Sequence, residues 1–416
     1  MMTGTDVEPT REERQLLRRL AEQVAEIAAL PVQAERARLW RKTNQLRPER
    51  PLVLADPQNG WCELVPETDL QCSQPLLRGW EMNLRRLLFR HDHIHDDWPV
   101  TPFFNVGWVI HGGDYGLHET QTRSEDRGSY AWDAPIKDVA QFEQLHQREI
   151  RVDHAATQAQ VDFAQDLVGD LLTVRRFGES TCRVKLTRVL VHLRGLQQML
   201  LDMYDHPDFL HAMMAFLRDD FLHEWQLYER EGVMTLNNQP DSLLGSGSIG
   251  HTTDLPADDF PGQVRMQDMW CWGESQETVG VGPAQFDEFV LQYQLPLMNR
   301  FGLVDYGCCE PLDTRFDLLL RQVPRLRSVA VSPWCNRALA AQKLGGRCVY
   351  VWKQNPTLLC APEPNYALAE HEIRETMEIA KQCSLVMVMK DTSTFHNQAE
   401  RITRWTDLAS RLARNG

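Results

Sequence analysis

Residues 305–311 read Asp-Tyr-Gly-Cys-Cys-Glu-Pro and follow the apolar residues 301–304. The apolar residues predict the end of a helix and a short buried strand, and the polar residues predict the loop where that strand ends. Cysteine is usually buried and inert, but two thiols beside a glutamate at a strand end favour a soft-metal site or a reactive thiol. Three alternatives stay open: zinc ligation by Cys308 with Cys309 or Glu310, a thiol that acts without metal, and ordinary packing.

Short apolar runs alternate with helical patterns along most of the chain. Strands are predicted near residues 50–54 and at 103–110, 171–175, 233–236, 264–269, 303–306, 328–331, 348–352 and 385–389. Helices are predicted between several of them, at 196–204, 208–230, 283–299 and 370–382. This alternation indicates an α/β fold with a parallel sheet and helical crossovers, and the number of strands favours a closed (β/α)8 TIM barrel over an open sheet.

The N-terminal region differs from this pattern. Apolar residues at 16, 17, 20, 24, 27 and 28 recur at helical spacing with charged residues between them. We therefore predict an N-terminal helical extension at residues 1–49 and a barrel domain at residues 50–416.

Composition excludes some classes of function. The chain has 416 residues and a net charge of -14, which argues against a nucleic-acid partner. No apolar run approaches the roughly 20 residues of a membrane span, and the charged N-terminus lacks a signal core. These features predict a cytoplasmic protein without a membrane partner, whose 10 cysteines are reduced and form no CxxC pair.

Residues 270–277 (Trp-Cys-Trp-Gly-Glu-Ser-Gln-Glu) place aromatic and polar side chains after a predicted strand. Aromatic walls with a few polar groups suit a small ligand, although packing and capping would use the same residue types. In a barrel, the residues that follow the other strands lie at the same end. The predicted substrate-binding residues are Trp270, Trp272, Gln276, Tyr306, Asn237 and Trp334.

Lys390 and Asp391 follow the last predicted strand. They could bind an anion, orient a substrate or act as an acid–base pair, and a salt-bridged rim is the alternative. With Cys308 and Glu274 they are the predicted catalytic residues.

Two further segments have unusual compositions. The histidine-rich stretch 91–98 could bind a metal or be an ordinary polar loop. The glycine-rich stretch 245–250 predicts a mobile loop or lid rather than a phosphate cradle.

The chain resembles the uroporphyrinogen decarboxylase-like superfamily, which includes the corrinoid-dependent methyltransferases. The resemblance covers about residues 50–405 and rests on three segments. These are Gly-Leu-Val-Asp-Tyr-Gly-Cys-Cys-Glu-Pro at 302–311, Leu-Gly-Gly at 344–346 leading to Asn-Pro at 355–356, and the closing Lys390-Asp391. It implies a TIM barrel with a ligand pocket at the carboxyl ends of its strands.

In the methyltransferase branch, a His-x-Cys pair and a later cysteine bind a zinc that activates a thiol acceptor. Here Tyr306-Gly307-Cys308 stands in place of His-x-Cys, and Lys390 and Asp391 stand where the later cysteine would be. Cys308 therefore matches the family pattern, whereas two of the three zinc ligands do not.

The resemblance implies a methyltransferase or demethylase that moves a methyl group between a small methylated substrate and a corrinoid carried by a partner protein. Zinc held by Cys308, Cys309 and Glu310 is the expected metal, and a homodimer is the expected assembly. A cofactor-independent decarboxylase is the alternative, although residues 64–116 lack the arginine-rich pattern of that enzyme. A non-catalytic barrel that binds a small molecule is the other alternative.

Overall fold

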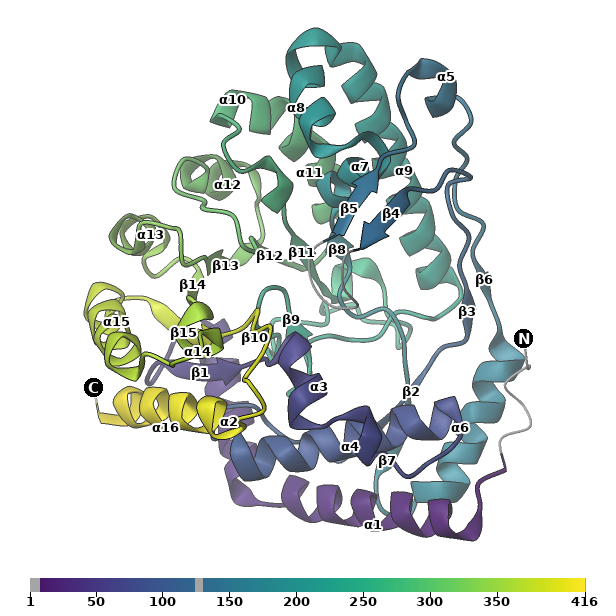
Figure 1. Cartoon of the computed structure of the whole chain (residues 1–416), viewed down its shortest axis with the longest axis vertical. Coiled ribbons are helices and arrows are strands. Elements are labelled where there is room, and N and C mark those ends of the chain that lie inside the picture. Colours follow the sequence, from purple (N-terminus) through teal and green to yellow (C-terminus); the bar gives the residue numbers. More distant parts are fainter. Residues whose placement is uncertain (1–7, 124–129, 416) are drawn as a thin grey trace.

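The computed structural model describes residues 8–123 and 130–415. Helices and strands alternate along them, as the sequence predicts for an α/β protein (Figure 1). None of the helices in these residues combines the length and the apolar character that crossing a membrane requires.

The centre of the fold is a sheet of seven parallel strands. Their order across the sheet is β1 (Leu52–Ala55), β15 (Ser384–Met389), β14 (Val349–Gln354), β13 (Leu326–Val331), β12 (Leu303–Tyr306), β11 (Trp270–Gly273) and β8 (Arg183–Val184). Every residue of β1, β11, β12, β14 and β15 is buried. Such continuous burial is typical of a parallel sheet that is covered on both faces.

Helices connect consecutive strands from β11 to β15 and cover one face of this sheet (Figure 1). They are α10 (Pro283–Phe286), the π-helical turn η5 (Asp287–Leu291), α11 (Gln292–Met298), α12 (Phe316–Gln322), α13 (Arg337–Leu344), α14 (Thr357–Cys360) and α15 (Tyr366–Ile379). The last helix, α16 (Glu400–Asn415), packs against β1 and α15 through an apolar stripe that includes Ile402 and Trp405.

The N-terminal region contains α1 (Arg11–Ala28), which packs on α4 (Pro75–His93) and α6 (His154–Val168), and α2 (Pro31–Asn44), which packs on β15. The helical character predicted for this region is confirmed, and the division at residue 49 stays a prediction. Short helices follow at η1 (Gln58–Gly60), α3 (Trp61–Leu64) and η2 (Glu67–Asp69).

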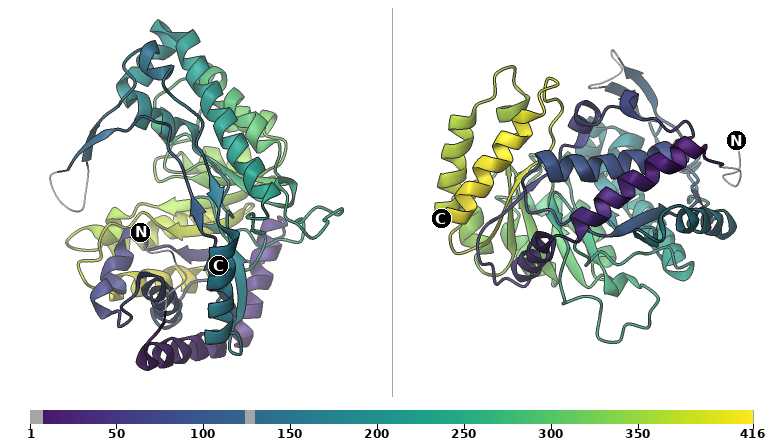
Figure 2. Two further views of the ribbon diagram at one scale, coloured as in Figure 1. Left: turned by 90° about the vertical axis from the view of Figure 1, so that its right-hand side faces the viewer. Right: turned by 90° about the horizontal axis from the view of Figure 1, so that it is seen from below.

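The middle of the chain adds helices and small hairpins beside β8. The helices are α5 (Val139–Phe142), α7 (Leu186–Arg194), α8 (Leu196–Asp205) and α9 (Pro207–Arg230), and the short turns are η3 (Met266–Asp268) and η4 (Gln276–Thr278). Two antiparallel pairs join β3 (Ile110–His111) to β6 (Arg151–Val152) and β4 (Thr120–Arg123) to β5 (Tyr130–Asp133). The β4–β5 pair projects from the body of the molecule (Figure 2).

Two further strands form a separate parallel pair, β2 (Phe103–Gly107) with β7 (Thr173–Phe177). Within residues 8–123 and 130–415, no strand pairing joins this pair to the seven-stranded sheet. The parallel α/β sheet is thus confirmed, whereas the strand pairing does not show the predicted closed barrel.

The free edge of β1 is covered by the acidic part of the histidine-rich stretch. The backbone N–H groups of Val53 and Ala55 donate to Asp97 Oδ2 and Asp96 Oδ2, both at 2.9 Å. Arg50 and Arg90 form ion pairs with Asp97 and Asp96 at 2.6 and 2.7 Å. These paired carboxylates satisfy donors that an exposed strand edge would leave open to another chain.

The opposite face of the sheet from α15 and α16 is filled by a small hairpin, β9 (Leu243–Leu244) with β10 (Ser248–Ile249). Ile249 packs in a cluster with Leu52, Val349 and Val386. Residues 244–250 are all buried. The glycine-rich stretch is therefore a core element, and the prediction of a mobile loop or lid is wrong.

Glycine is required in this hairpin because the backbone approaches the sheet closely. A Cβ atom at Gly245, which has a φ of +53°, would lie 1.6 Å from Asp305 Oδ2. We expect Gly245→Ala to lower the free energy of unfolding by about 2–4 kcal/mol, because it combines backbone strain with overpacking. Urea denaturation measures the change.

The matched control is Gly346→Ala on the surface, where a Cβ atom would have nothing within 4 Å. We expect that variant to stay within about 0.5 kcal/mol of the wild type. Equal stability of the two variants would contradict the close packing of the hairpin.

Candidate functional site

Four side chains meet at the carboxyl ends of β12, β14 and β15, and we call them the thiol–lysine cluster: Cys308, Cys309, Lys353 and Asp391. The Lys353 ammonium lies 3.5 Å from Cys309 Sγ and 3.3 Å from Asp391 Oδ2, and it donates to Ser246 Oγ at 2.9 Å. Cys308 Sγ lies 3.7 Å from Cys309 Sγ. Three strand ends and the β9–β10 hairpin therefore build one polar site.

The two thiols of the cluster differ in acidity. The hydrogen bond with Cys308 lowers the pKa of the Cys309 thiol, and the nearby Lys353 cation lowers it further. The same hydrogen bond, together with burial, raises the pKa of the Cys308 thiol. Burial alone would lower the pKa of Lys353, but Asp391 and the two sulfur atoms raise it. Cys309 is thus the more acidic of the two thiols, although the negative charge of Asp391, 3.6 Å away, opposes the effect of the Lys353 cation.

Lys390 and Asp391 belong to this site but do not pair with each other. Lys390 Nζ lies 3.7 Å from Asp56 Oδ2, at the end of β1. The Gln58 amide, oriented to satisfy both neighbours, donates to Asp391 Oδ1 at 3.0 Å and accepts from Lys390 at 3.3 Å. Asp391 has a φ of +60°, a conformation that is uncommon for residues other than glycine and concentrates at functional sites.

Asp305, the first residue of the opening stretch, is a buried carboxyl below the cluster. Burial raises its pKa to about 7, although Ser328 and the two lysines of the site lower it in part. Its Oδ2 atom has no hydrogen-bond partner among the described residues. An acid with this pKa carries its proton in a large fraction of molecules at neutral pH.

Glu274 is a second buried acid, just beyond β11. Burial raises its pKa to about 8, and negative charge on Glu277 and Glu310 acts in the same direction. Arg183 is its nearest cation, at 3.1 Å from Oε1, and stacks over the Trp272 ring at 4.2 Å. Neither carboxyl oxygen has a well-aligned hydrogen bond within the described part of the chain. Glu274 is therefore protonated at neutral pH and can act as a general acid.

Glu310 performs a structural task in this geometry. Its Oε1 atom accepts from the Ser275 N–H at 3.0 Å, and its Oε2 atom accepts from the Cys308 N–H at 2.9 Å. The carboxylate thereby links the loops after β11 and β12 and fixes the backbone of Cys308.

The expected zinc site does not match these side chains. Both oxygens of Glu310 are engaged by backbone donors, and the Lys353 ammonium occupies the space beside Cys309 where a metal cation would compete with it. Within residues 8–123 and 130–415, no group of three or more His, Cys, Asp or Glu side chains could hold a metal ion. The donor set around Cys308 and Cys309 thus suits a protein cation better than zinc.

Only some of the residues predicted to bind substrate lie at the site. Trp272 faces the site, and its indole N–H donates to the Gly307 carbonyl at 2.9 Å. Trp270 is fully buried and donates to the Gly250 carbonyl at 3.0 Å, so it anchors the hairpin. Gln276 lies half-buried in η4, and Trp334 is 66% exposed on the surface.

Two further predicted binding residues hold the backbone together. Tyr306 is fully buried on the helix-covered face and donates to Gln294 Oε1 at 2.8 Å. Asn237 accepts from the Trp270 N–H at 2.9 Å and donates to the carbonyls of Ser180 and Trp270 at 2.7 and 2.9 Å. The predicted strand at 233–236 is irregular, and the Asn237 side chain supplies bonds that a regular strand would have made.

Sequence reasoning did not assign roles to Lys353, Asp305, Ser246 and Arg183. Alternation along β14 and β12 contains a signal for two of them, since Lys353 and Asp305 are charged residues within otherwise apolar strands. No local pattern reveals Ser246, because it reaches the cluster through the fold of a hairpin about 60–145 residues away from its partners along the chain.

Comparison with known proteins adds little to this geometry. Neither a family model nor a curated protein matches the chain. Among solved structures, it is similar to a methyltransferase from Methanosarcina mazei, with 9% sequence identity over 71% of this chain and 75% of that chain and a TM-score of 0.40. A likeness at this level does not define an activity, so a function is inferred from the geometry of the site alone.

The pairing of Cys309 with Lys353 has a chemical consequence. We expect Lys353→Met to slow alkylation of Cys309 by iodoacetamide by about tenfold at pH 7, because the thiolate loses its cation. Mass spectrometry of tryptic peptides measures the rate. Cys360, also half-buried, is the internal control and should react at the same rate in both proteins. An unchanged Cys309 rate would contradict the ion pair.

The raised pKa of Asp305 makes stability depend on pH. Since the folded-state pKa of about 7 exceeds the ordinary value of 3.8, its stabilising contribution is complete below about pH 4 and is lost as the pH rises through 7. As the pH rises from about 5 to 8, the free energy of unfolding should fall in both proteins. We expect the fall to be roughly 1–3 kcal/mol smaller in Asp305→Asn than in the wild type. Urea denaturation at each pH tests this. The exposed Asp258→Asn is the control, and a wild-type pH profile in Asp305→Asn would refute the assignment.

Proposed function

We propose that this protein is an enzyme that removes a methyl group from a small O- or N-methylated substrate and passes it to a partner protein. The observation that carries this proposal is the convergence of a thiol of lowered pKa, a buried ammonium and a carboxyl of raised pKa at one end of a parallel sheet. Ligands of open parallel sheets and of barrels bind at this end of the strands.

Glu274 has the central role in this proposal. Cleavage of a carbon–oxygen or carbon–nitrogen bond leaves an electron pair on the heteroatom, and a proton from Glu274 would neutralise it. Because burial holds the pKa of Glu274 at about 8, the carboxyl has a proton to give at neutral pH. Arg183 would stabilise the carboxylate that remains, since it already lies 3.1 Å from Oε1. The carboxylate then regains its proton from solvent.

The thiol–lysine cluster would orient the substrate. Cys309 and Asp391 lie at its more open side, whereas Lys353 is 2% exposed beneath them. Asp391 offers carboxylate oxygens at this side, which favours substrates with a donor or a positive charge near the methyl group.

The methyl acceptor is proposed to be a corrinoid held by a partner protein, which would supply the nucleophile and form the new bond to the methyl carbon. No step of this proposal runs through zinc, because the side chains around Cys308 do not fit that metal.

Decarboxylation is the second candidate. Lys353 and Lys390 are two buried ammonium groups whose charge would hold a substrate carboxylate. Loss of carbon dioxide would leave the bonding electron pair on carbon, and Glu274 or Asp305 would supply the proton that forms the new C–H bond.

The test is an assay with free reduced cobalamin as methyl acceptor and a panel of O- and N-methylated compounds, in which formation of methylcobalamin is followed by absorbance. We expect turnover that survives a zinc chelator, a loss of at least 100-fold in Glu274→Gln and of about 10–100-fold in Cys309→Ser. Glu378→Gln, on the exposed side of α15, is the control for folding and should retain full activity.

Absence of turnover with the whole panel, or wild-type turnover in Glu274→Gln, would overturn the proposal. Release of carbon dioxide from a carboxylated analogue, lost in Lys353→Met, would instead favour the second candidate.

A further inference from the structure

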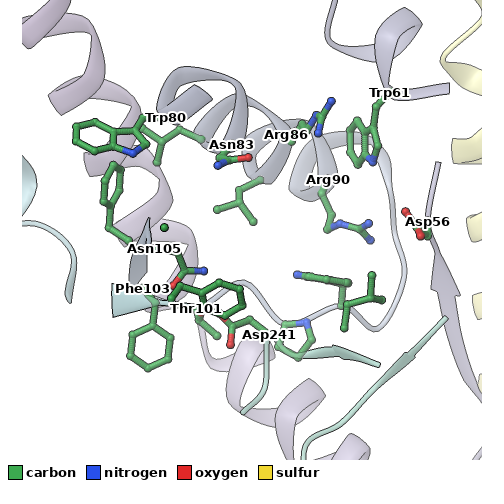
Figure 3. A pocket seen from close by; sticks show the side chains of 18 residues that line it. Asp56, Trp61, Trp80, Asn83, Arg86, Arg90, Thr101, Phe103, Asn105 and Asp241 are labelled. Carbon is green, nitrogen blue, oxygen red and sulfur yellow. The ribbon is translucent and has the colours of Figure 1, made fainter. Parts of the chain in front are cut away.

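A cavity of about 480 Å³ lies between α4 and the β2–β7 pair (Figure 3). Its size is within the range of small-molecule sites. It contains no member of the thiol–lysine cluster, and only Asp56, which contacts Lys390, connects the two regions. The sequence patterns that predict the catalytic site do not include its lining.

Aromatic rings form most of the cavity wall. Tryptophans come from α3, from α4 and from the segment that precedes β2, and phenylalanines come from β2 and β7: Trp61, Trp80, Trp98, Phe103, Phe104 and Phe177. Trp80 and Phe104 meet edge to face, with ring centroids 5.2 Å apart. Flat walls of this kind favour a planar aromatic ligand, which can stack or make edge contacts with them.

Three polar atoms at the cavity are buried and have no hydrogen-bond partner in the described part of the chain: Arg86 Nε, Trp98 Nε1 and Asp241 Oδ1. Buried donors and acceptors are normally satisfied by protein, solvent or ligand. Arg86 lies on α4, and Figure 3 shows it across the cavity from Asp241. Two unsatisfied donors and one unsatisfied acceptor therefore surround the same space.

Three of the four charged side chains of the lining already have an ion-pair partner. Arg90 is paired with Asp96 at 2.7 Å, Asp56 contacts Lys390, and Asp241 is paired with Arg175 at 2.7 Å. Arg86 forms no ion pair within the described residues: its guanidinium lies 5.4 Å from the centre of the Trp61 ring, and the charge of Asp56 acts on it from a greater distance. Its guanidinium fork is therefore open to a ligand carboxylate, which it matches in geometry.

We infer that this cavity is a binding site for a small planar aromatic monocarboxylate that carries a hydrogen-bond donor at the end remote from its carboxylate. The carboxylate binds Arg86 and the Trp98 indole N–H, the ring lies between the aromatic walls, and the remote donor reaches Asp241 Oδ1. Asn83 and Asn105, which also line the cavity, offer amide groups to either end. This inference does not rest on the proposed function.

The test is isothermal titration calorimetry on the full chain with 4-hydroxybenzoate, which has the carboxylate, the ring and the remote donor. We expect saturable binding with one site. Two matched probes separate the contributions: 4-hydroxybenzamide lacks the charge, and benzoate lacks the remote donor. We expect the amide to bind at least tenfold more weakly and benzoate about three- to tenfold more weakly.

Variants identify the site and separate binding from folding. Arg86→Gln should weaken 4-hydroxybenzoate at least tenfold, with a melting temperature close to that of the wild type, because it removes a half-buried cation that has no ion pair among the described residues. Arg321→Gln, on the exposed surface of α12, should bind like the wild type. Lack of saturable binding by 4-hydroxybenzoate, or equal affinity in Arg86→Gln, would overturn the inference. Equal affinity for the acid and the amide would overturn the assignment of a carboxylate.

Discussion

The structure depends on the burial of one ammonium group. Lys353 is 2% exposed within β14, and a charge removed from water must find partners or be neutralised. Its partners come from three other places in the chain: Ser246 in the β9–β10 hairpin, Cys309 after β12 and Asp391 after β15. Satisfying this one cation therefore brings the hairpin against the sheet and holds the strand ends in a fixed relation.

The same constraint decides the chemistry of the site. The cation beside Cys309 lowers the pKa of that thiol without a metal, and both oxygens of Glu310 accept from the backbone of two loops. The two acids in the neighbourhood, Asp305 and Glu274, are buried where their charged forms are disfavoured. The site thus brings a thiol of lowered pKa together with two carboxyls of raised pKa, which water alone would not produce.

Much of the fold follows from patterns in the sequence. Continuous apolar runs predict the strands at 303–306, 348–352 and 385–389, and each lies in the sheet within a few residues of its predicted place. The location of Cys308, Cys309, Lys390 and Asp391 at strand ends follows from the same patterns. The prediction for the glycine-rich stretch was wrong for a physical reason. The glycine-rich stretch looks polar and mobile, yet its glycines are needed because Asp305 and Val388 leave no room for a Cβ atom.

The sequence by itself determined the strands at 303–306, 348–352 and 385–389 and the reactive side chains at their ends, because hydrophobic periodicity is a local property of a chain. Only the tertiary structure decided which of those side chains meet. It placed Lys353 beside Cys309, directed Glu310 to the backbone, and left Arg86 Nε without a hydrogen-bond partner among the described residues beside an aromatic cavity. Charge pairing depends on distances between residues far apart in the chain, and those distances are set by the packing of the whole sheet.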